Sequence, residues 1–343
     1  MHERDEMNKK SLQAKKNHHY VWAHYLARWS DDGKNVWHTT PTGKIILGSV
    51  RAFSKEDYFY KSKELTSNHI HIIRYLSSLC PRNLQEQHES FLSDFLKVQK
   101  LGTLYHASGM SDHEADQALH ALKCNMMENL HSSHEKEART TIDFLASGEI
   151  SILAEGDNLI NFVAFLGHQI SRTKLFKERF SSTLPEASKM GSDGIQVHKL
   201  IEDCWWFVSY MLGINIGWSL YAGRNSDSHC LLINDTKVGF ITSDQPVINV
   251  HPNLKEGEVV PPTDETCDFF FPLSPKAAYM INKSETFSQG TTVISENVAK
   301  EMNEKVAKAA RTHIVGADRD TVALYSKHVG TRDAIVKGHF GQL

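Results

Sequence analysis

The spacing of apolar side chains divides the chain into a helical middle and strand-rich ends. From about residue 84 to residue 212, Leu, Ala, Glu, Lys and Gln are frequent and Pro185 is the sole proline. Apolar residues recur every three or four positions from Asn158 to Phe180, the period of a helix with one buried face. A capping box at Ser111–Glu114 predicts the start of another helix. The pattern therefore predicts a large helical block, interrupted by a loop at residues 181–194.

Short runs of β-prone residues lie on both sides of this block. Asn35–Thr39 and Lys44–Leu47 are separated by a Pro-Thr-Gly turn and predict a β-hairpin. The aromatic stretch His18–Trp29 predicts a short helix before the hairpin. Further runs in the last third predict an antiparallel meander, followed by a helix over about 295–313. The expected strands of the meander cover residues 216–221, 230–233, 238–242 and 268–271.

This order of elements predicts an α+β fold. Strands from the N- and C-terminal parts are expected to join one mixed or antiparallel sheet, with the helical block at about 84–212 inserted between them. Residues 1–17 are rich in charge and are expected to form a flexible lead-in. Residues 18–343 are expected to form a single domain.

The segment Cys204–Gly223 contains no charged residue over a length that could span a bilayer. Polar and small residues interrupt it, and Lys and Arg are not clustered on either flank, which favours a place in a protein core. Its pattern fits a helix as far as Gly213, followed by strand-like alternation from Ile216. We therefore expect no membrane partner.

Composition places the chain among ordinary globular proteins. Its 343 residues are 40 % hydrophobic and 23 % charged, which excludes disordered and collagen-like classes. Lys and Arg number 38 against 41 Asp and Glu, so the chain does not have the bulk positive charge of a protein that coats nucleic acid. A local basic patch remains compatible with this balance. The 20 His make behaviour near pH 6 to 7 sensitive to protonation.

Neither the N-terminal residues nor the cysteine pattern points to secretion. The first twenty residues mix both charge signs without an apolar stretch, so no secretory signal is expected and the predicted location is the cytoplasm. The five Cys are widely spaced and contain no C-x-x-C pair, which indicates neither a disulfide framework nor a zinc ribbon. Phosphate-binding loops, dinucleotide fingerprints, nucleophile elbows and H-E-x-x-H motifs are also missing from the sequence.

Three local groups of residues carry candidate chemistry, and the first lies near the N-terminus. His18 and His19 stand beside Tyr20 and close to Tyr25. Imidazole can act as general acid, general base or metal ligand at neutral pH. The alternative is an aromatic element whose rings pack on a sheet.

The second group lies on the predicted helix after Asn158. Gln169 and Arg172 are three residues apart and therefore share a face of that helix. Arg172 is expected either to bind an anion or to pair with an acidic residue inside the protein. Both interpretations stay open on the sequence.

The third group follows the run at 238–241. Ser243 and Asp244 stand where a strand gives way to a proline turn. One interpretation is that both side chains hydrogen-bond local backbone and shape the turn. The other is that Asp244 acts as a ligand, a general base or a partner of an arginine at a strand end.

At these residues the sequence resembles a bacterial family of uncharacterised proteins, domain of unknown function 4238. The family hallmarks are H-H-Y-V-P-x-x-Y-L, K-D-F-Y, Q-x-x-R-T-P, T-S-D-N-P-V and F-P-L-S-P, in that order. The chain departs from them at Trp22, at Ala27-Arg28, at Lys174 and at Gln245. The matching segments are His18–Val21 with Tyr25-Leu26, Glu56–Tyr60, Gln169–Thr173, Thr242–Val247 and Phe271–Pro275.

The resemblance implies that polar motifs far apart in sequence converge on one site. The catalytic candidates are His18, His19 and Asp244, with His as acid or base and Asp244 orienting a His or holding a metal. The candidates for binding substrate, with Arg172 on a phosphate, are Tyr25, Tyr60, Gln169, Arg172 and Ser243.

These residues lead to one functional expectation and one alternative. The expected function is that of an intracellular bacterial effector that cleaves or modifies nucleic acid by hydrolase chemistry. An association with phage defence is implied by the family resemblance and not by any residue. The alternative is a module that binds a nucleotide, nucleic acid or protein without catalysis. Mg²⁺ or Mn²⁺ are the candidate cofactors, and nucleic acid, a nucleotide or other protein subunits are the candidate partners.

Overall fold

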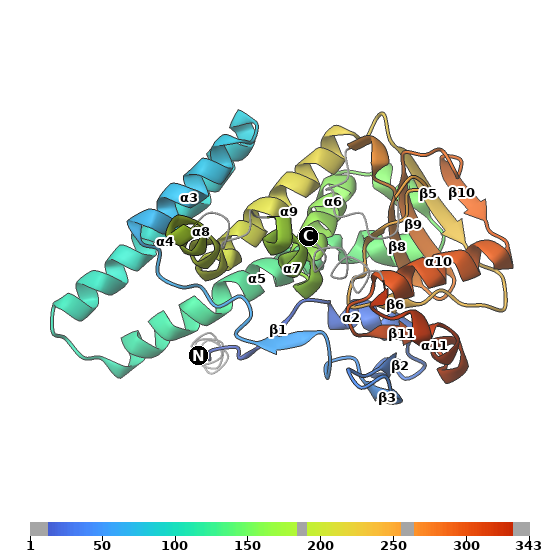
Figure 1. The fold of residues 1–343 in the computed structure, drawn as a ribbon, viewed down its shortest axis with the longest axis horizontal. Coiled ribbons are helices and arrows are strands. Elements are labelled where there is room, and N and C mark those ends of the chain that lie inside the picture. Colours follow the sequence, from blue (N-terminus) through green and yellow to red (C-terminus); the bar gives the residue numbers. More distant parts are fainter. Residues whose placement is uncertain (1–12, 184–190, 255–263, 332–343) are drawn as a thin grey trace.

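The computed structural model describes residues 13–183, 191–254 and 264–331 (Figure 1). Helices dominate the middle of the chain, and strands occupy both ends, which confirms the predicted α+β class. The helical block begins earlier and ends later than predicted. Its helices are α3 (Ser67–Ser78), α4 (Arg82–Ala107), α5 (His113–Ala146), α6 (Asn158–Ser171), α7 (Lys174–Thr183), α8 (Gly191–Asp203) and α9 (Trp205–Ala222).

One sheet joins the two ends of the chain, as the order of elements predicts. The hairpin strands β2 (Asn35–Thr39) and β3 (Ile45–Ser49) pair antiparallel, and β11 (Ile314–Gly316) adds to β2. The short strand β6 (Thr242–Ser243) completes the order β3-β2-β11-β6. This sheet brings Ser243, from the last third of the chain, close to the N-terminal elements.

A second, larger sheet is built from C-terminal strands alone. Its order is β10-β5-β9-β8-β7, and the pair β10–β5 is parallel while the other pairs are antiparallel. Of the predicted meander, the strands expected at 230–233 and 268–271 form as β5 and β8, while β7, β9 and the parallel strand β10 were not predicted. The strands are β5 (Ser228–Ile233), β7 (Ile248–Asn249), β8 (Phe269–Ser274), β9 (Ala277–Asn282) and β10 (Gly290–Val293).

The predicted strand at 216–221 is wrong, because α9 continues to Ala222 without a break. Gly213 and Gly217 lie on the face of α9 that meets α6. A Cβ added to Gly167 of α6 would lie 2.3 Å from the carbonyl oxygen of Gly213. These glycines therefore allow two helices to approach closely and do not end one. Among the described residues, no helix has the length and apolar character needed to cross a bilayer.

Other boundaries also differ from the expectation. The aromatic stretch after residue 17 forms the strand β1 (Asn17–His19) and the short helix α2 (Ala23–Leu26). The predicted helix 158–180 divides into α6 and α7 around Arg172. Asp112 caps α5 by accepting the backbone N–H of Glu114 and Ala115, so the cap lies one residue after the predicted Ser111.

Three more predicted segments differ in extent. The run expected at 238–242 keeps only its last residue in a strand, at the start of β6. The helix expected over about 295–313 forms as α10 (Glu296–Ala309), is capped by the side chain of Ser295, and ends before 313. The loop expected at 181–194 is narrowed by α7 and α8, and its residues 184–190 lie outside the described part of the chain, like residues 1–12 of the predicted lead-in.

The strand β1 is one half of a two-stranded ribbon that lies against the helical block. It pairs antiparallel with β4 (Lys55–Asp57), so that His18 lies opposite Glu56 and His19 opposite Lys55. Lys15 precedes the ribbon and donates its backbone N–H to Asn125 of α5, at 2.7 Å. The ribbon is thereby fixed against α5, on the side of the helical block that faces α2 and β11 (Figure 1).

Candidate acid–base site

The three sequence groups meet through two side-chain hydrogen bonds. The hydroxyl of Tyr25 lies 2.6 Å from Oγ1 of Thr242 and donates to the carbonyl oxygen of Pro272 at 2.8 Å. Thr173, next to Arg172, donates to the side-chain oxygen of Gln245 at 2.8 Å. The N-terminal group, the end of α6 and the turn after β6 are therefore neighbours in the fold.

His18 uses both ring nitrogens on the backbone. Its Nδ1 accepts the N–H of Tyr60 at 2.8 Å, and its Nε2 lies 3.1 Å from the carbonyl oxygen of Lys15, to which it donates. The ring is buried and stacks on Tyr60 with centroids 5.9 Å apart. Burial lowers the pKa of His18, so the neutral ring is the form that these bonds require. This arrangement favours a structural role; the catalytic role stays a prediction.

Asp244 is likewise occupied by backbone donors. Its Oδ1 accepts the N–H of Arg311 at 2.8 Å, and its Oδ2 accepts those of Thr312 at 2.7 Å and His313 at 3.0 Å. Burial raises the pKa of Asp244, and the three N–H donors counteract that rise. Ser243 bonds only its neighbour Gln245, accepting its N–H and donating to its carbonyl. Ser243 thus shapes the turn after β6, as the turn interpretation expects, whereas Asp244 binds the backbone of the distant segment 311–313.

Arg172 is held by an internal acid. Its side chain is 2 % exposed, and Nη1 donates to Oε1 of Glu135 on α5 at 2.7 Å. Nη2 donates to Gln169, whose own Nε2 donates to the carbonyl oxygen of Tyr20 at 2.9 Å. Tyr60 donates its hydroxyl to the carbonyl oxygen of Arg172 at 2.5 Å. Gln169, Arg172 and Tyr60 therefore belong to one buried network that joins α5, α6 and the N-terminal segment.

Glu128 of α5 lies beside this network and was not singled out from the sequence. Its Oε1 is 4.0 Å from Nδ1 of His19, and their side chains are 14 % and 26 % exposed. Burial raises the pKa of Glu128 to about 7, Arg172 opposes this rise and Glu135 adds to it. Burial also lowers the pKa of His19. Glu128 thus titrates near neutral pH, the range that suits general acid–base catalysis, whereas the pKa of His19 lies below its ordinary value.

Each member of this pair has a buried polar atom without a hydrogen-bond partner. Nε2 of His19 and Oε2 of Glu128 are buried and have no hydrogen-bond partner in the part of the chain that the structure describes. Buried polar atoms without partners are uncommon in native folds and cost free energy. We call His19 and Glu128 the acid–base pair. It differs from His18, whose nitrogens are both engaged.

Histidines line the inner side of the Arg172 network. His134 and His168 stack with ring centroids 4.4 Å apart, and His131 meets Tyr60 edge to face at 4.8 Å. Burial lowers the pKa of His131 and His168 well below the ordinary value, and the charge of Arg172 adds to the effect. They are therefore neutral at pH 7. Gly213 makes room for this layer, because a Cβ there would lie 2.5 Å from Nδ1 of His168.

A periodic signal for the missed residues was present in the sequence. Glu128, His131 and Glu135 recur at helical spacing within the block, so they share one face of α5. Polar residues repeated on a face that is expected to be buried indicate internal pairing or a site. In the sequence, the apolar stripe of the neighbouring helix α6 is the stronger signal, so this polar face of α5 was not predicted to carry a site.

No metal cluster accompanies these residues. In the described ranges, no three or more His, Cys, Asp or Glu side chains are arranged to hold a metal ion. The expectation of Mg²⁺ or Mn²⁺ therefore has no protein-side ligand set to attach to among these residues.

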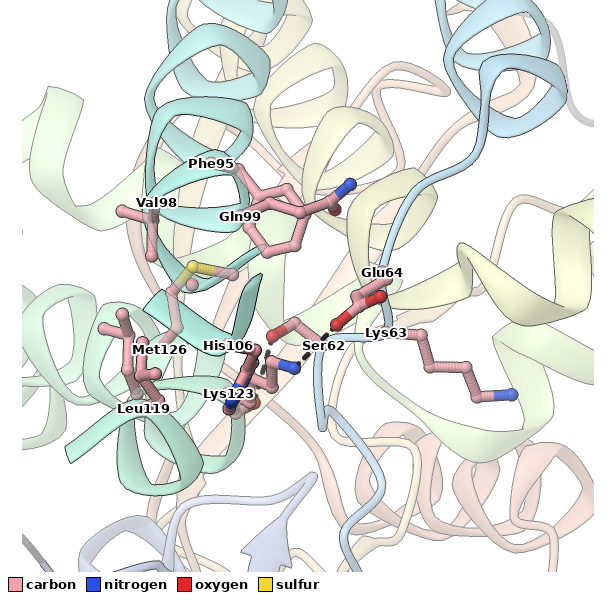
Figure 2. Close-up of a pocket in the computed structure, with 12 residues that line it drawn as sticks. Ser62, Lys63, Glu64, Phe95, Val98, Gln99, His106, Leu119, Lys123 and Met126 are labelled. Atoms are coloured by element: carbon pink, nitrogen blue, oxygen red, sulfur yellow. Dashed lines mark hydrogen bonds and ion pairs between the residues drawn. The ribbon is translucent and has the colours of Figure 1, made fainter. Parts of the chain in front are cut away.

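A small pocket lies elsewhere, between α4, α5 and the segment 62–64 (Figure 2). Lys123 pairs with Glu64 at its rim, at 2.9 Å, and Phe95 and Met126 form part of its apolar wall. Its volume of about 50 Å³ leaves room for a few waters, at roughly 10 to 15 Å³ each. None of the residues predicted from the sequence to act in catalysis or binding lines it.

Comparison with known families supports the resemblance seen in the motifs. Residues 221–320 match the family described as Protein of unknown function (DUF4238). Thr242–Val247 and Phe271–Pro275 lie inside the matched residues, and the three earlier motifs lie outside them. No curated protein and no solved structure matches the chain. The family description carries no activity, so the function rests on the geometry of the site.

Proposed function

We propose that the chain cleaves nucleic acid by acid–base catalysis, with RNA as the favoured substrate. The observation that carries the proposal is the pair of His19 and Glu128, 4.0 Å apart, each with a buried polar atom that has no hydrogen-bond partner among the described residues and that a substrate reaches only when the site opens locally. A cytoplasmic bacterial effector in phage defence is the setting that the family resemblance supports. The predicted participation of His18 and Asp244 in catalysis is replaced in this proposal by Glu128.

The relative pKa values of the pair assign the two roles. Burial raises the pKa of Glu128 to about 7 and lowers that of His19, so the main single-proton form at neutral pH has a protonated carboxyl and a neutral imidazole. His19 is therefore the base and Glu128 the acid. RNA suits this pair because it carries its own nucleophile, the 2′-hydroxyl.

The proposed reaction is a transesterification. Nε2 of His19 removes the proton of the 2′-hydroxyl, and the oxygen attacks the adjacent phosphorus. The bond from phosphorus to the 5′-oxygen breaks, and the carboxyl of Glu128 protonates that oxygen as it leaves. The products are a 2′,3′-cyclic phosphate and a 5′-hydroxyl. Proton exchange with water then returns His19 to its neutral form and Glu128 to its protonated form.

The direct test is cleavage of transfer RNA, single-stranded DNA and duplex DNA by purified protein, with and without Mg²⁺ or Mn²⁺. Parent protein should cut the RNA and release 2′,3′-cyclic phosphate ends, and His19→Gln should lose about 10²-fold or more of the rate. His24→Gln is the matched control, because His24 lies in the same motif but faces Asp143 at 4.0 Å. Equal rates for His19→Gln and His24→Gln would reject the proposal.

The second candidate is the non-catalytic binding module. It is favoured by the internal hydrogen bonds of Asp244, His18 and Arg172. A chain of this kind should bind nucleic acid or a nucleotide and leave every substrate intact, whether or not His19 is replaced.

A further inference from the structure

The turn after β4 presents two aromatic rings, each with a lysine over it. Nζ of Lys61 lies 5.2 Å from the centroid of Tyr58, and Nζ of Lys177 on α7 lies 5.9 Å from that of Phe59. The side chain of Tyr58 is exposed at 37 %, whereas Phe59 is partly buried against Tyr20. A ring and a cation side by side form the combination that binds an unpaired base and its phosphate.

The backbone of Tyr58 supports a specific purpose for this turn. Its φ is +56°, a left-handed conformation that is a clear outlier for a bulky residue. Two hydrogen bonds hold it there: Tyr58 donates its N–H to the carbonyl of Lys16 at 2.8 Å and accepts that of Lys61 at 3.0 Å. Backbone strain of this kind gathers at binding and active sites. The turn thus keeps an aromatic ring exposed in a fixed place.

The charge on this face is positive. Lys16 pairs with Asp57, and Lys174 pairs with Glu56, so the negative charges of these two carboxylates are neutralised. Within the described residues, four further cations of this face have no acidic partner within 4.0 Å; they are Arg51, Lys55, Lys61 and Lys177. The chain as a whole carries a charge of −3, so this excess is local.

The face leads to the acid–base pair. Lys55 lies opposite His19 in the ribbon, and the charges of Lys55 and Arg51 both lower the pKa of that imidazole, which places them beside it. Tyr58, which directly follows β4, contacts the ring of His18 edge to face, with ring centroids 6.3 Å apart. A strand stacked on Tyr58 must therefore pass from the His18 face of the ribbon to the His19 face to bring its phosphates into the basic region around His19.

We propose that the ribbon β1–β4, the turn at Tyr58 and the facing side of α7 form a binding surface for single-stranded nucleic acid. This inference rests on the proposed function, since it supplies the strand on which His19 and Glu128 act. Exposed rings require unpaired bases, because the bases of a duplex are stacked on each other. The face lacks the exposed aliphatic side chains that a membrane-surface element would bury, since Tyr58 is its one large exposed hydrophobic residue among those described.

The test uses a fluorescent oligo-dT strand, which lacks the 2′-hydroxyl and cannot undergo the proposed reaction. Parent protein should bind it more tightly than a DNA hairpin duplex. Tyr58→Asn removes the ring while keeping a residue that tolerates positive φ, and should weaken binding by about tenfold. Lys61→Gln with Lys177→Gln should weaken binding. The slope of the logarithm of the binding constant against the logarithm of the salt concentration should become less steep by about 1.4, from roughly 0.7 for each lost phosphate contact.

Control variants separate this surface from the catalytic proposal. Lys97→Gln with Lys100→Gln removes two lysines from α4, a helix remote from the ribbon (Figure 1), and should leave oligo-dT binding unchanged. Binding without RNA cleavage by the parent would overturn the proposed function alone. RNA cleavage with oligo-dT binding that is insensitive to Tyr58→Asn and to the Lys61/Lys177 pair would overturn the surface alone.

Two further outcomes also contradict the surface. One is a duplex bound as tightly as the single strand. The other is tight binding to vesicles of phosphatidylcholine and phosphatidylserine that depends on the same lysines, with no binding of oligo-dT, since this would assign the face to an anionic membrane.

Discussion

Adjacent histidines in one strand have opposite surroundings. His18 points into the fold and uses both nitrogens on backbone partners, whereas Nε2 of His19, beside Glu128, is buried without a hydrogen-bond partner among the described residues. The difference arises from the alternation of side chains along β1, which places neighbouring residues on opposite faces. Sequence alone presents the two imidazoles as equivalent, and only their partners distinguish a structural residue from a candidate base.

Replacing each histidine separates these roles through stability. His18→Ala leaves the buried N–H of Tyr60 without an acceptor, and should lower the free energy of unfolding by about 1 to 3 kcal/mol. His19→Gln should change it by less than about 0.5 kcal/mol, as partly exposed substitutions usually do. Urea unfolding of both variants measures the difference. Equal stabilities would remove the structural assignment of His18.

The raised pKa of Glu128 has a consequence that needs no substrate. Between its ordinary value of 4.5 and about 7, the folded chain holds a proton on Glu128 that the unfolded chain has released. The free energy of unfolding therefore falls as pH rises through this window, by up to about 3 kcal/mol, and the loss is complete above it.

Glu128→Gln removes this contribution. Relative to the parent, the variant should gain stability between pH 5 and 8, as measured by urea unfolding at each pH, whereas Glu137→Gln on the exposed side of α5 should not. A parent-like pH dependence in Glu128→Gln would show that the carboxyl of Glu128 titrates in its ordinary range.

Within the helical block, neighbouring helices are joined by two different kinds of contact. Arg172, at the end of α6, reaches Glu135 on α5 through a buried ion pair. The helices α6 and α9 instead meet through glycines that bring their backbones together. The first kind needs a matched charge and the second needs the absence of a side chain, so each predicts a distinct response to substitution.

Removing the arginine should unfold the junction of α5 and α6. Arg172→Ala leaves Glu135 buried without its partner and should cost about 3 to 5 kcal/mol. The double change Arg172→Met with Glu135→Leu should recover much of that loss, because no buried charge then remains. Thermal unfolding compares the two. A melting temperature that Arg172→Ala leaves unchanged would instead support an arginine that faces an external anion.

Adding one methyl group tests the contact between α6 and α9. In Gly167→Ala the new Cβ would lie 2.3 Å from the backbone oxygen of Gly213, so the helices must separate and stability should fall by about 1 to 3 kcal/mol. Gly102→Ala in α4 is the control, since its Cβ meets only Leu119 at 3.6 Å. That control should be neutral or stabilising by up to about 1 kcal/mol. The reverse order of the two melting temperatures would contradict this packing.

At the scale of the whole molecule, local patterns were sufficient for the fold class and insufficient for its details. The β2–β3 hairpin and α10 carry turn and capping residues that act over a few positions, and both form as predicted. The segment after Gly213 was misread because glycine ends a helix in isolation, whereas here it meets Gly167 of another helix. Such contacts depend on residues far away in the sequence.

The candidate site shows the same division. Tyr60, Gln169 and Arg172 were expected to meet, and their hydrogen bonds join them. Glu128 was missed because its raised pKa arises from burial by several elements at once and from the charge of Glu135, against the opposing charge of Arg172. A polar residue on a long helix looks solvated until its surroundings are known.

The dependence of RNA cleavage on pH tests the central claim most directly. With His19 as base and Glu128 as acid, the rate of the parent should fall tenfold per pH unit well above about 7, where Glu128 loses its proton. It should also fall on the acid side, below the lowered pKa of His19. Glu128→Gln should lose most of the rate and the alkaline decline together, while Glu137→Gln keeps both. A parent profile that stays level through pH 7 to 9, with full activity in Glu128→Gln, would contradict the account.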